Sequence, residues 1–226
     1  EGLRCSREAL RFCLDGVLAV IIDETISDLP EIPPELPMYR ISQKLFGELA
    51  QTESPQGVLL LCRRPSPPKP EDARDPFILV FDRIQTPGNL GSMLRTAVGI
   101  GLRHVACTKG TVDPFSAKAI RAGMGAQFML DIDLADSLEE VIATYGSNGY
   151  PRTWLTVPRD GVQAFSTEFD LRNSLLVMGN EANGVEMTEG ASLVTIPMDS
   201  RLESLNVAQA ATILMYQYTS RYGLVI

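Results

Sequence analysis

The stretch Ile196-Pro-Met-Asp-Ser-Arg-Leu-Glu-Ser-Leu-Asn206 contains the end of a strand, a polar loop and the start of a helix. Residues 193–196 form a short apolar run, and Pro197 ends it because proline cannot donate to a sheet ladder. Asn206 is in the position of a helix N-cap, where its side-chain oxygen accepts from free N–H groups of the next turn. Apolar side chains then recur with helical spacing at Val207, Ala210, Ala211, Leu214 and Tyr218. The stretch predicts either the edge of a pocket in an α/β protein or an ordinary terminal strand–helix unit.

Length and composition indicate a globular protein of one long domain or two small ones. The chain has 226 residues, of which 45% are hydrophobic, and its mean hydropathy of +0.04 is compatible with a buried core. The longest apolar run, residues 17–22, is too short to span a bilayer, so no membrane partner is expected. His104 lies in an apolar run, which favours packing over catalysis. Four cysteines without paired spacing indicate reduced thiols and no metal site: Cys5, Cys13, Cys62 and Cys107.

The charge of the chain argues against a broad surface for polyanions. The formal net charge is −8, and the parts before and after Asp75 both carry an excess of acidic residues. Contact with nucleic acid would therefore come from local basic clusters. The chain starts at Glu1, so a targeting segment cannot be read from it. We expect an intracellular protein, in the cytoplasm or an organelle, with the compartment unknown.

The first part of the chain predicts a small α/β unit. The expected elements are a helix over residues 6–14, a strand over 17–22, a proline-rich loop, a helix capped by Ser42 that runs to about Ala50, and a strand over 57–62. Residues 63–70 then contain four prolines, which is typical of a semi-rigid linker. We place the domain boundary there, with residues 1–72 before it and 73–226 after it.

Beyond the linker, apolar runs alternate regularly with helical segments. Strands are predicted over residues 77–81, 104–107, 128–130, 154–157, 175–178 and 193–196. The expected helices are residues 90–100, a helix from Asp113 as N-cap and Pro114 to about Arg121, and a helix to Tyr145 that begins with a capping box at Ser137. This alternation predicts a parallel sheet covered by helices on both faces.

Two further stretches place polar residues after predicted strands. In residues 82–97 the chain turns through Pro87-Gly88 and enters a helix near Asn89, with the bare backbone of Gly91 and then Arg95. This arrangement suits a phosphate or a ribose, and the alternative is a plain capped helix with a solvated arginine.

The second of these stretches covers residues 175–185. It brings Gly179, Asn180 and Glu181 to the carboxyl edge of a strand, where ligands of open α/β sheets bind, and the alternative is a simple turn. The spacing is neither a dinucleotide-binding fingerprint nor a P-loop, which disfavours a nucleotide-dependent oxidoreductase.

Together the three stretches resemble the sequence motifs of the SpoU/TrmH family of RNA ribose 2′-O-methyltransferases, in the SPOUT superfamily. The matched patterns are N-x-G-x-x-x-R-x-A at 89–97, G-x-E-x-x-G at 179–184, and I-P-M followed by S-L-N-V at 196–198 and 204–207. The resemblance covers roughly residues 77–222. Departures are small, with Ala182 where a glycine is common and Val185 where a leucine is common. They bear on the local shape of the cofactor loop.

The resemblance implies an α/β fold, namely a parallel-sheet SPOUT domain with a C-terminal trefoil knot. Residues 1–62 more weakly resemble the small α/β RNA substrate-binding domain that often precedes it, without its first strand. The family usually forms homodimers and binds S-adenosyl-L-methionine in the knot. The resemblance places the expected cofactor-binding residues in and beside the matched motifs, at Met178, Gly179, Asn180, Gly184, Ile196, Met198, Leu205 and Asn206. Thr156, at the end of its predicted strand, is a further candidate.

The implied reaction is an attack of a ribose 2′-oxygen of tRNA or rRNA on the sulfonium methyl group, without a metal. The expected catalytic residues are Arg95, Asn89, Glu181, Ser204 and Asn206. Arg95 is expected to hold a phosphate and steady the developing alkoxide, and Glu181 either accepts the proton or orients Asn89. RNA contacts are expected at Arg95, Lys118 and Arg121, with a solvated helix face as the alternative for the last two. Two rival functions are a SPOUT methyltransferase acting on a base nitrogen and a non-catalytic RNA-binding or ribosome-assembly factor.

Overall fold

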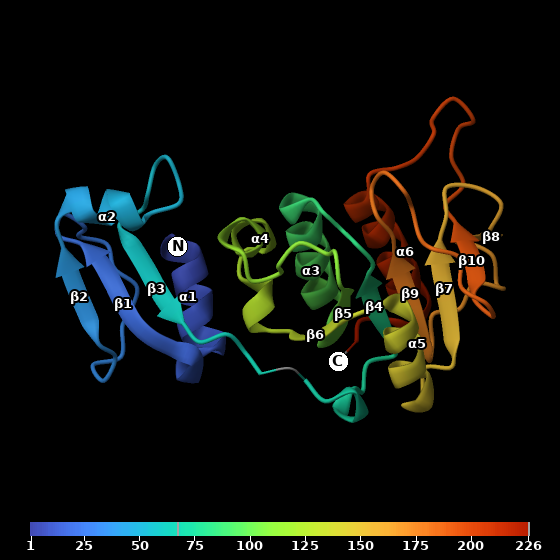
Figure 1. Cartoon of the computed structure of the whole chain (residues 1–226), viewed down its shortest axis with the longest axis horizontal. Helices are drawn as coiled ribbons and strands as arrows, with labels where there is room; N and C mark the ends of the chain where they lie inside the picture. Colours follow the sequence, from blue (N-terminus) through green and yellow to red (C-terminus); the bar gives the residue numbers. More distant parts are fainter. Residues whose placement is uncertain (67, 226) are drawn as a thin grey trace.

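The computed structural model describes residues 1–66 and 68–225, so residue 67 of the proline-rich linker lies outside the described residues. The chain forms two sheets, each with its own core (Figure 1). In Figure 1 the small sheet lies at one end of the molecule, and helix α1 lies between it and the larger domain. Among the described residues, no helix has the length and apolarity that a membrane crossing requires.

The first sheet has three strands in the order β2-β1-β3, with β1 parallel to β2 and antiparallel to β3. The elements of this part are α1 (Leu3–Phe12), η1 (Leu14–Gly16), β1 (Val17–Asp23), β2 (Met38–Ile41), α2 (Gln43–Leu49) and β3 (Val58–Cys62). The predicted cap is confirmed, because the Ser42 hydroxyl accepts from Leu45 N. Helix α1 begins three residues earlier than predicted. Strand β2 was not predicted, since this edge strand is largely exposed and its sequence does not alternate.

The second sheet has seven strands, all parallel, in the order β6-β5-β4-β9-β7-β10-β8, which confirms the predicted parallel sheet. Its strands are β4 (Phe77–Phe81), β5 (His104–Thr108), β6 (Asp131–Ala135), β7 (Arg152–Thr156), β8 (Val162–Gln163), β9 (Ser174–Met178) and β10 (Ser192–Thr195). The helical elements are η2 (Pro70–Asp72), α3 (Pro87–Ile100), α4 (Ala117–Gly123), η3 (Ala126–Phe128), α5 (Leu138–Ser147) and α6 (Val207–Tyr222). The trefoil knot stays a prediction.

All five residues of strand β4 are buried because helices cover both faces of the sheet. Phe77, Leu79 and Phe81 belong to the core shared with α3 and α6. Ile78 and Val80 belong to the core shared with α5 on the other face. A continuous apolar run is the pattern that such a doubly covered strand requires.

Three of the predicted elements in this domain are wrong in their bounds. Helix α3 begins at Pro87, so Pro87-Gly88 is its first turn and not a preceding turn. Helix α4 is capped by Ser116, since Asp113 instead accepts from Phe115 N in a tight turn. The strand predicted over residues 128–130 is displaced by η3, and β6 begins at Asp131. Its alternating Asp-Ile-Asp-Leu pattern is that of an edge strand with one face covered.

Gly91 allows α3 and α4 to pack closely. A Cβ at Gly91 would lie 2.6 Å from Ala119 O and 2.6 Å from Gly123 N, both of which are backbone atoms. We expect Gly91→Ala to lower the free energy of unfolding by about 1–3 kcal/mol, as overpacked cores do. Gly99→Ala on the same helix is the matched control, because nothing lies within 4 Å of its Cβ position.

We expect the control Gly99→Ala to raise the free energy of unfolding by about 0.5–1 kcal/mol, because alanine restricts the unfolded chain. Urea denaturation of both variants measures the difference. Equal changes in the two variants would contradict the close approach of the helices at Gly91.

Candidate active site

The carboxyl ends of β7, β9 and β10 and the first turns of α3 and α6 line a pocket with a volume of about 570 Å³. All nine residues predicted to bind the cofactor line it, namely Thr156, Met178, Gly179, Asn180, Gly184, Ile196, Met198, Leu205 and Asn206. Four of the five predicted catalytic residues line it as well: Asn89, Glu181, Ser204 and Asn206. The three sequence stretches therefore converge on one cavity.

Glu181 joins the second stretch to the first. Its carboxylate accepts from Gln85 N at 3.1 Å, Thr86 N at 3.1 Å and Asn89 Nδ2 at 3.0 Å. The first two donors lie just ahead of α3, where the helix dipole favours a negative charge. Burial alone would raise the pKa of Glu181, but the hydrogen bonds from Asn89 and the two backbone groups outweigh it and bring the pKa to about 2. An ionised carboxylate held in this way is a poor proton acceptor at neutral pH, so the geometry favours the orienting role.

Asn206 joins the first stretch to the third. Its Nδ2 donates to Asn89 Oδ1 at 3.1 Å, while its Oδ1 accepts from Ala208 N and Gln209 N at the start of α6. The predicted N-cap is confirmed. A continuous chain of hydrogen bonds thus runs from Glu181 through Asn89 to Asn206. It uses both the Nδ2 and the Oδ1 atom of Asn89 and so fixes the orientation of the Asn89 amide.

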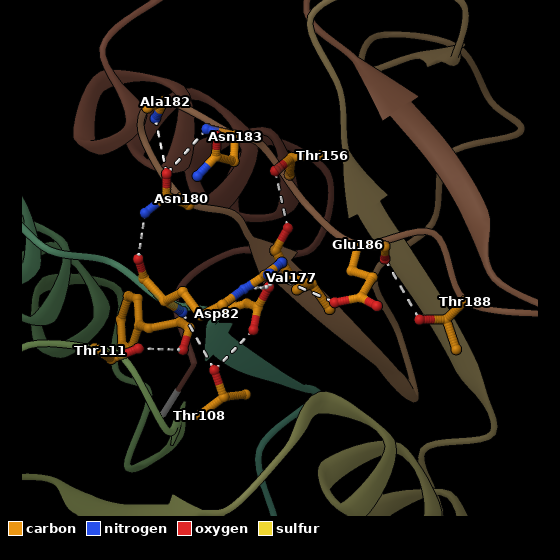
Figure 2. Close-up of polar contacts among 12 residues, drawn as sticks. Asp82, Thr108, Thr111, Thr156, Val177, Asn180, Ala182, Asn183, Glu186 and Thr188 are labelled. Atoms are coloured by element: carbon orange, nitrogen blue, oxygen red, sulfur yellow. Dashed lines mark hydrogen bonds and ion pairs between the residues drawn. The ribbon is translucent and has the colours of Figure 1, made fainter.

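The loop after β9 is tightly folded at the pocket wall. A Cβ at Gly179 would lie 2.5 Å from Val185 N, so this position accepts only glycine without movement of the loop. Asn180 and Gly184 exchange two backbone hydrogen bonds, and Gly184 has a φ of 70°. Figure 2 shows the Asn180 side chain bonded to Ala182 and Asn183, and Thr156 bonded to the carbonyl of Val177. Glu181 and Ala182 of this loop are exposed where they line the pocket.

Arg95 lies outside the lining of the pocket. It is exposed on α3, six residues beyond Asn89, which corresponds to about 9 Å along the helix axis. Its neighbours on the exposed face of the helix are small, namely Gly88, Ser92 and Gly99. The Arg95 guanidinium is therefore accessible to a large substrate that also reaches the pocket, and its catalytic role stays a prediction.

The two other residues predicted to contact RNA lie on α4, and the structure distinguishes them. Lys118 is exposed. The Arg121 side chain is only 29% exposed and lies 3.6 Å from the carboxylate of Glu1. The Lys118 ammonium group is thus accessible to a phosphate, whereas the Arg121 guanidinium is partly buried and close to the Glu1 carboxylate. Both RNA contacts stay predictions.

Several pocket residues were not predicted from the sequence. They are Thr86, Val157, Pro158, Ala182, Val194, Glu203, Val207, Ala210 and Leu214. Val157 and Pro158 directly follow β7, so the rule that ligands bind at the carboxyl edge of a sheet would have found them.

Among the described residues, no group of three or more His, Cys, Asp or Glu side chains is placed to hold a metal ion. His104 is buried, with its Nδ1 3.3 Å from Asp75 Oδ2, which agrees with the expectation that this histidine packs in the interior.

Residues 76–216 match the model of the SpoU rRNA methylase family. The 23S rRNA (guanosine(2553)-2′-O)-methyltransferase RlmP of Bacillus subtilis is 33% identical over 233 residues, which cover 96% of this chain and 86% of that protein. The mitochondrial rRNA methyltransferase 3 of the mouse is 27% identical, over 96% of this chain and 66% of its own length. The SpoU methyltransferase AviRb of Streptomyces viridochromogenes has the same fold, with a TM-score of 0.81, 23% identity, and coverage of 98% and 88% of the two chains.

The fold and the pocket define an α/β methyltransferase of the SPOUT type. The chain belongs to the SpoU rRNA methylase family. This membership confirms the prediction of an S-adenosylmethionine-dependent RNA methyltransferase.

Proposed function

We propose that the protein methylates the ribose 2′-hydroxyl of a nucleotide in ribosomal RNA. The observation that carries this proposal is the hydrogen-bonded junction of Asn89, Glu181 and Asn206 in the lining of the pocket. All the matched motif residues are present. The name of the Bacillus subtilis relative specifies a 2′-O-methyltransferase of 23S rRNA, and the mouse relative is named as an rRNA methyltransferase.

The pocket suits an adenosine-containing ligand. Apolar side chains of Met178, Ile196, Leu205 and Leu214 would pack against a purine ring. S-Adenosylmethionine, when bound, supplies the methyl group. The role of the protein is then to place the ribose oxygen in line with that group.

The proposed roles of the polar residues follow from their contacts. Glu181 holds the Asn89 amide, and Asn206 fixes the amide from the other side. Asn89 is thus set to orient the cofactor or the ribose, and Ser204, which lines the same pocket, is proposed to act beside it. Arg95 would bind a phosphate next to the target nucleotide and stabilise negative charge on the attacking oxygen.

A transfer assay with radiolabelled S-adenosylmethionine and rRNA tests this function, followed by nuclease digestion and identification of the methylated nucleoside. We expect a 2′-O-methylated nucleoside, which resists alkaline cleavage at its 3′ side. A base-methylated nucleoside would instead support the rival base-nitrogen methyltransferase. Binding of RNA without binding of S-adenosylmethionine in calorimetry would support the non-catalytic factor.

We further propose that the protein acts as a homodimer, because the resemblance implies one. Light scattering tests the oligomeric state, with an expected mass of twice the chain mass of 24.7 kDa. A mass equal to a single chain at the concentration of the transfer assay would contradict the dimer.

The domain formed by residues 1–72 is proposed to select the RNA. It has its own sheet and core, and it lines none of the cofactor pocket. Deleting residues 1–72 is therefore expected to leave the affinity for S-adenosylmethionine within about twofold, and to weaken RNA binding by about tenfold or more, as the loss of phosphate contacts does. Calorimetry and filter binding measure the two affinities. An unchanged preference among RNA substrates would contradict the recognition role.

A further inference from the structure

Arg83 contacts the loop that lines the pocket, although it is not itself part of the lining. It follows β4 and the buried Asp82, and its φ of 55° lies in the left-handed region that a side chain other than glycine or asparagine rarely adopts. Such a conformation persists only when surrounding contacts determine it, and it is often found beside functional sites. The sequence motifs did not single out this residue.

The contacts that hold Arg83 come from three neighbouring segments. Its Nε and Nη2 donate to Asp82 Oδ2 at 3.1 and 2.9 Å, and its Nη1 lies 3.4 Å from Glu186 Oε2 in the loop after β9. Its backbone N donates to Thr108 Oγ1 at the end of β5. The same Thr108 hydroxyl donates to Asp82 Oδ1 at 2.7 Å, as Figure 2 shows. The Asp82 carboxylate, only 4% exposed, is thus paired on both oxygens.

The backbone of Arg83 then fixes the loop that lines the pocket. The Arg83 carbonyl accepts from Asn180 Nδ2 at 2.8 Å. This bond sets the orientation of the Asn180 amide, whose Oδ1 accepts from Ala182 N and Asn183 N at 2.9 Å each. Gly179, Asn180 and Ala182 line the pocket, whereas Asp82, Arg83 and Glu186 do not. Arg83 can therefore act on a ligand only through the shape of the loop.

We propose that Arg83 is a positioning residue for the S-adenosylmethionine loop, an inference that rests on the proposed cofactor site. Its left-handed backbone presents the carbonyl to Asn180, and its ion pairs with Asp82 and Glu186 tie residues 179–187 to the end of β4. The loop is thus preorganised before the cofactor binds. Without these ties, part of the binding free energy would be spent on ordering the loop.

The test separates the backbone of Arg83 from its side chain. Arg83→Gly tolerates the left-handed conformation and keeps the carbonyl, but it removes both ion pairs. We expect it to raise the dissociation constant for S-adenosylmethionine about tenfold, while kcat at saturating cofactor stays near the wild-type value. Amide hydrogen exchange at Ala182 and Asn183 should become faster in the cofactor-free variant. Arg83→Lys, which keeps a charge next to Asp82, should restore part of the affinity.

Arg172→Ala is the matched control. Arg172 also pairs with a nearby aspartate, at 2.7 Å from Asp170, and lies over the Tyr222 ring, but neither of these partners belongs to residues 179–187. It should change neither the cofactor affinity nor the exchange of the loop amides. If Arg83→Gly does not fold because Asp82 loses its partner, the double variant Asp82→Asn with Arg83→Gly removes both charges. Glu186→Gln, at an exposed position, keeps the Asp82 pair and reports on loop exchange alone.

The possible outcomes distinguish this inference from the proposed function. Wild-type cofactor affinity and wild-type loop exchange in the folded Arg83 variants and in Glu186→Gln would overturn the role of Arg83. Equal losses of affinity in the Arg83 and Arg172 variants would also overturn it. Failure of the wild-type protein itself to bind S-adenosylmethionine would instead overturn the proposed cofactor site.

Discussion

Arg95→Ala is expected to lower kcat for methyl transfer by about 100-fold or more, while the dissociation constant for S-adenosylmethionine stays within about twofold of the wild-type value. The reason is geometric. Arg95 is exposed on α3 and lies outside the pocket lining, so its removal leaves the cofactor contacts in place. It does remove the guanidinium that is proposed to hold a phosphate and the developing alkoxide. Single-turnover transfer and calorimetry measure the two quantities.

Two further variants make the Arg95 experiment specific. Arg95→Lys keeps the charge but loses the planar fork, so it should recover only part of the activity if bidentate binding matters. Arg103→Ala removes another exposed arginine, just beyond the C-terminal end of α3, and should leave the transfer rate unchanged. A large loss of cofactor affinity in Arg95→Ala would refute the assigned role.

Glu181→Gln is expected to raise the dissociation constant for S-adenosylmethionine about tenfold or more and to lower kcat as well. The wild-type carboxylate accepts three hydrogen bonds, from Gln85 N, Thr86 N and Asn89 Nδ2. A glutamine has a single acceptor oxygen in its side chain, so at least one of these donors loses its partner. The junction of the three segments would then loosen at Asn89. Glu168→Gln is the matched control, since Glu168 is exposed and lies outside the pocket lining.

The pH dependence of cofactor affinity and of kcat provides a second test of the role of Glu181. Its pKa of about 2 lies below the ordinary value of 4.5. The stability that ionised Glu181 gives to the folded site is therefore fully present above about pH 4.5, and it is lost as the pH falls towards 2. Because Glu181 stays ionised in this range, we expect its titration to cause no change in cofactor affinity between pH 8 and about pH 5. A fall in kcat with an apparent pKa near 6 that disappears in Glu181→Gln would show that Glu181 is the proton acceptor after all.

The sequence predicted those features that depend on local or strictly periodic signals. The caps at Ser42, Ser137 and Asn206 were predicted because each bonds to backbone groups two or three residues away. The doubly covered strands were predicted from their continuous apolar runs. The edge strands β2 and β8 were missed, because they are short and bury little surface. Their positions depend on the partner strands.

In the candidate site, too, features with a local signal were predicted and features that depend on distant partners were not. The motif residues that line the pocket were predicted, since each follows a strand or starts a helix. The bonds that join Glu181 to Asn89, and Asn89 to Asn206, span 92 and 117 residues of sequence. No local pattern shows such partners: the resemblance offered the Glu181–Asn89 contact as one of two alternatives, and the Asn89–Asn206 contact was not predicted. Arg83 was missed for the same reason, because its role depends on a left-handed backbone and on contacts with Thr108, Asn180 and Glu186.

Hydrogen–deuterium exchange with and without S-adenosylmethionine tests most directly whether the three sequence segments form one cofactor site. We expect slower exchange in three separate segments at once, namely residues 86–90, 178–185 and 196–207, with little change in α5 or the small sheet. Protection confined to one segment, or centred on residues outside the pocket, would contradict the account.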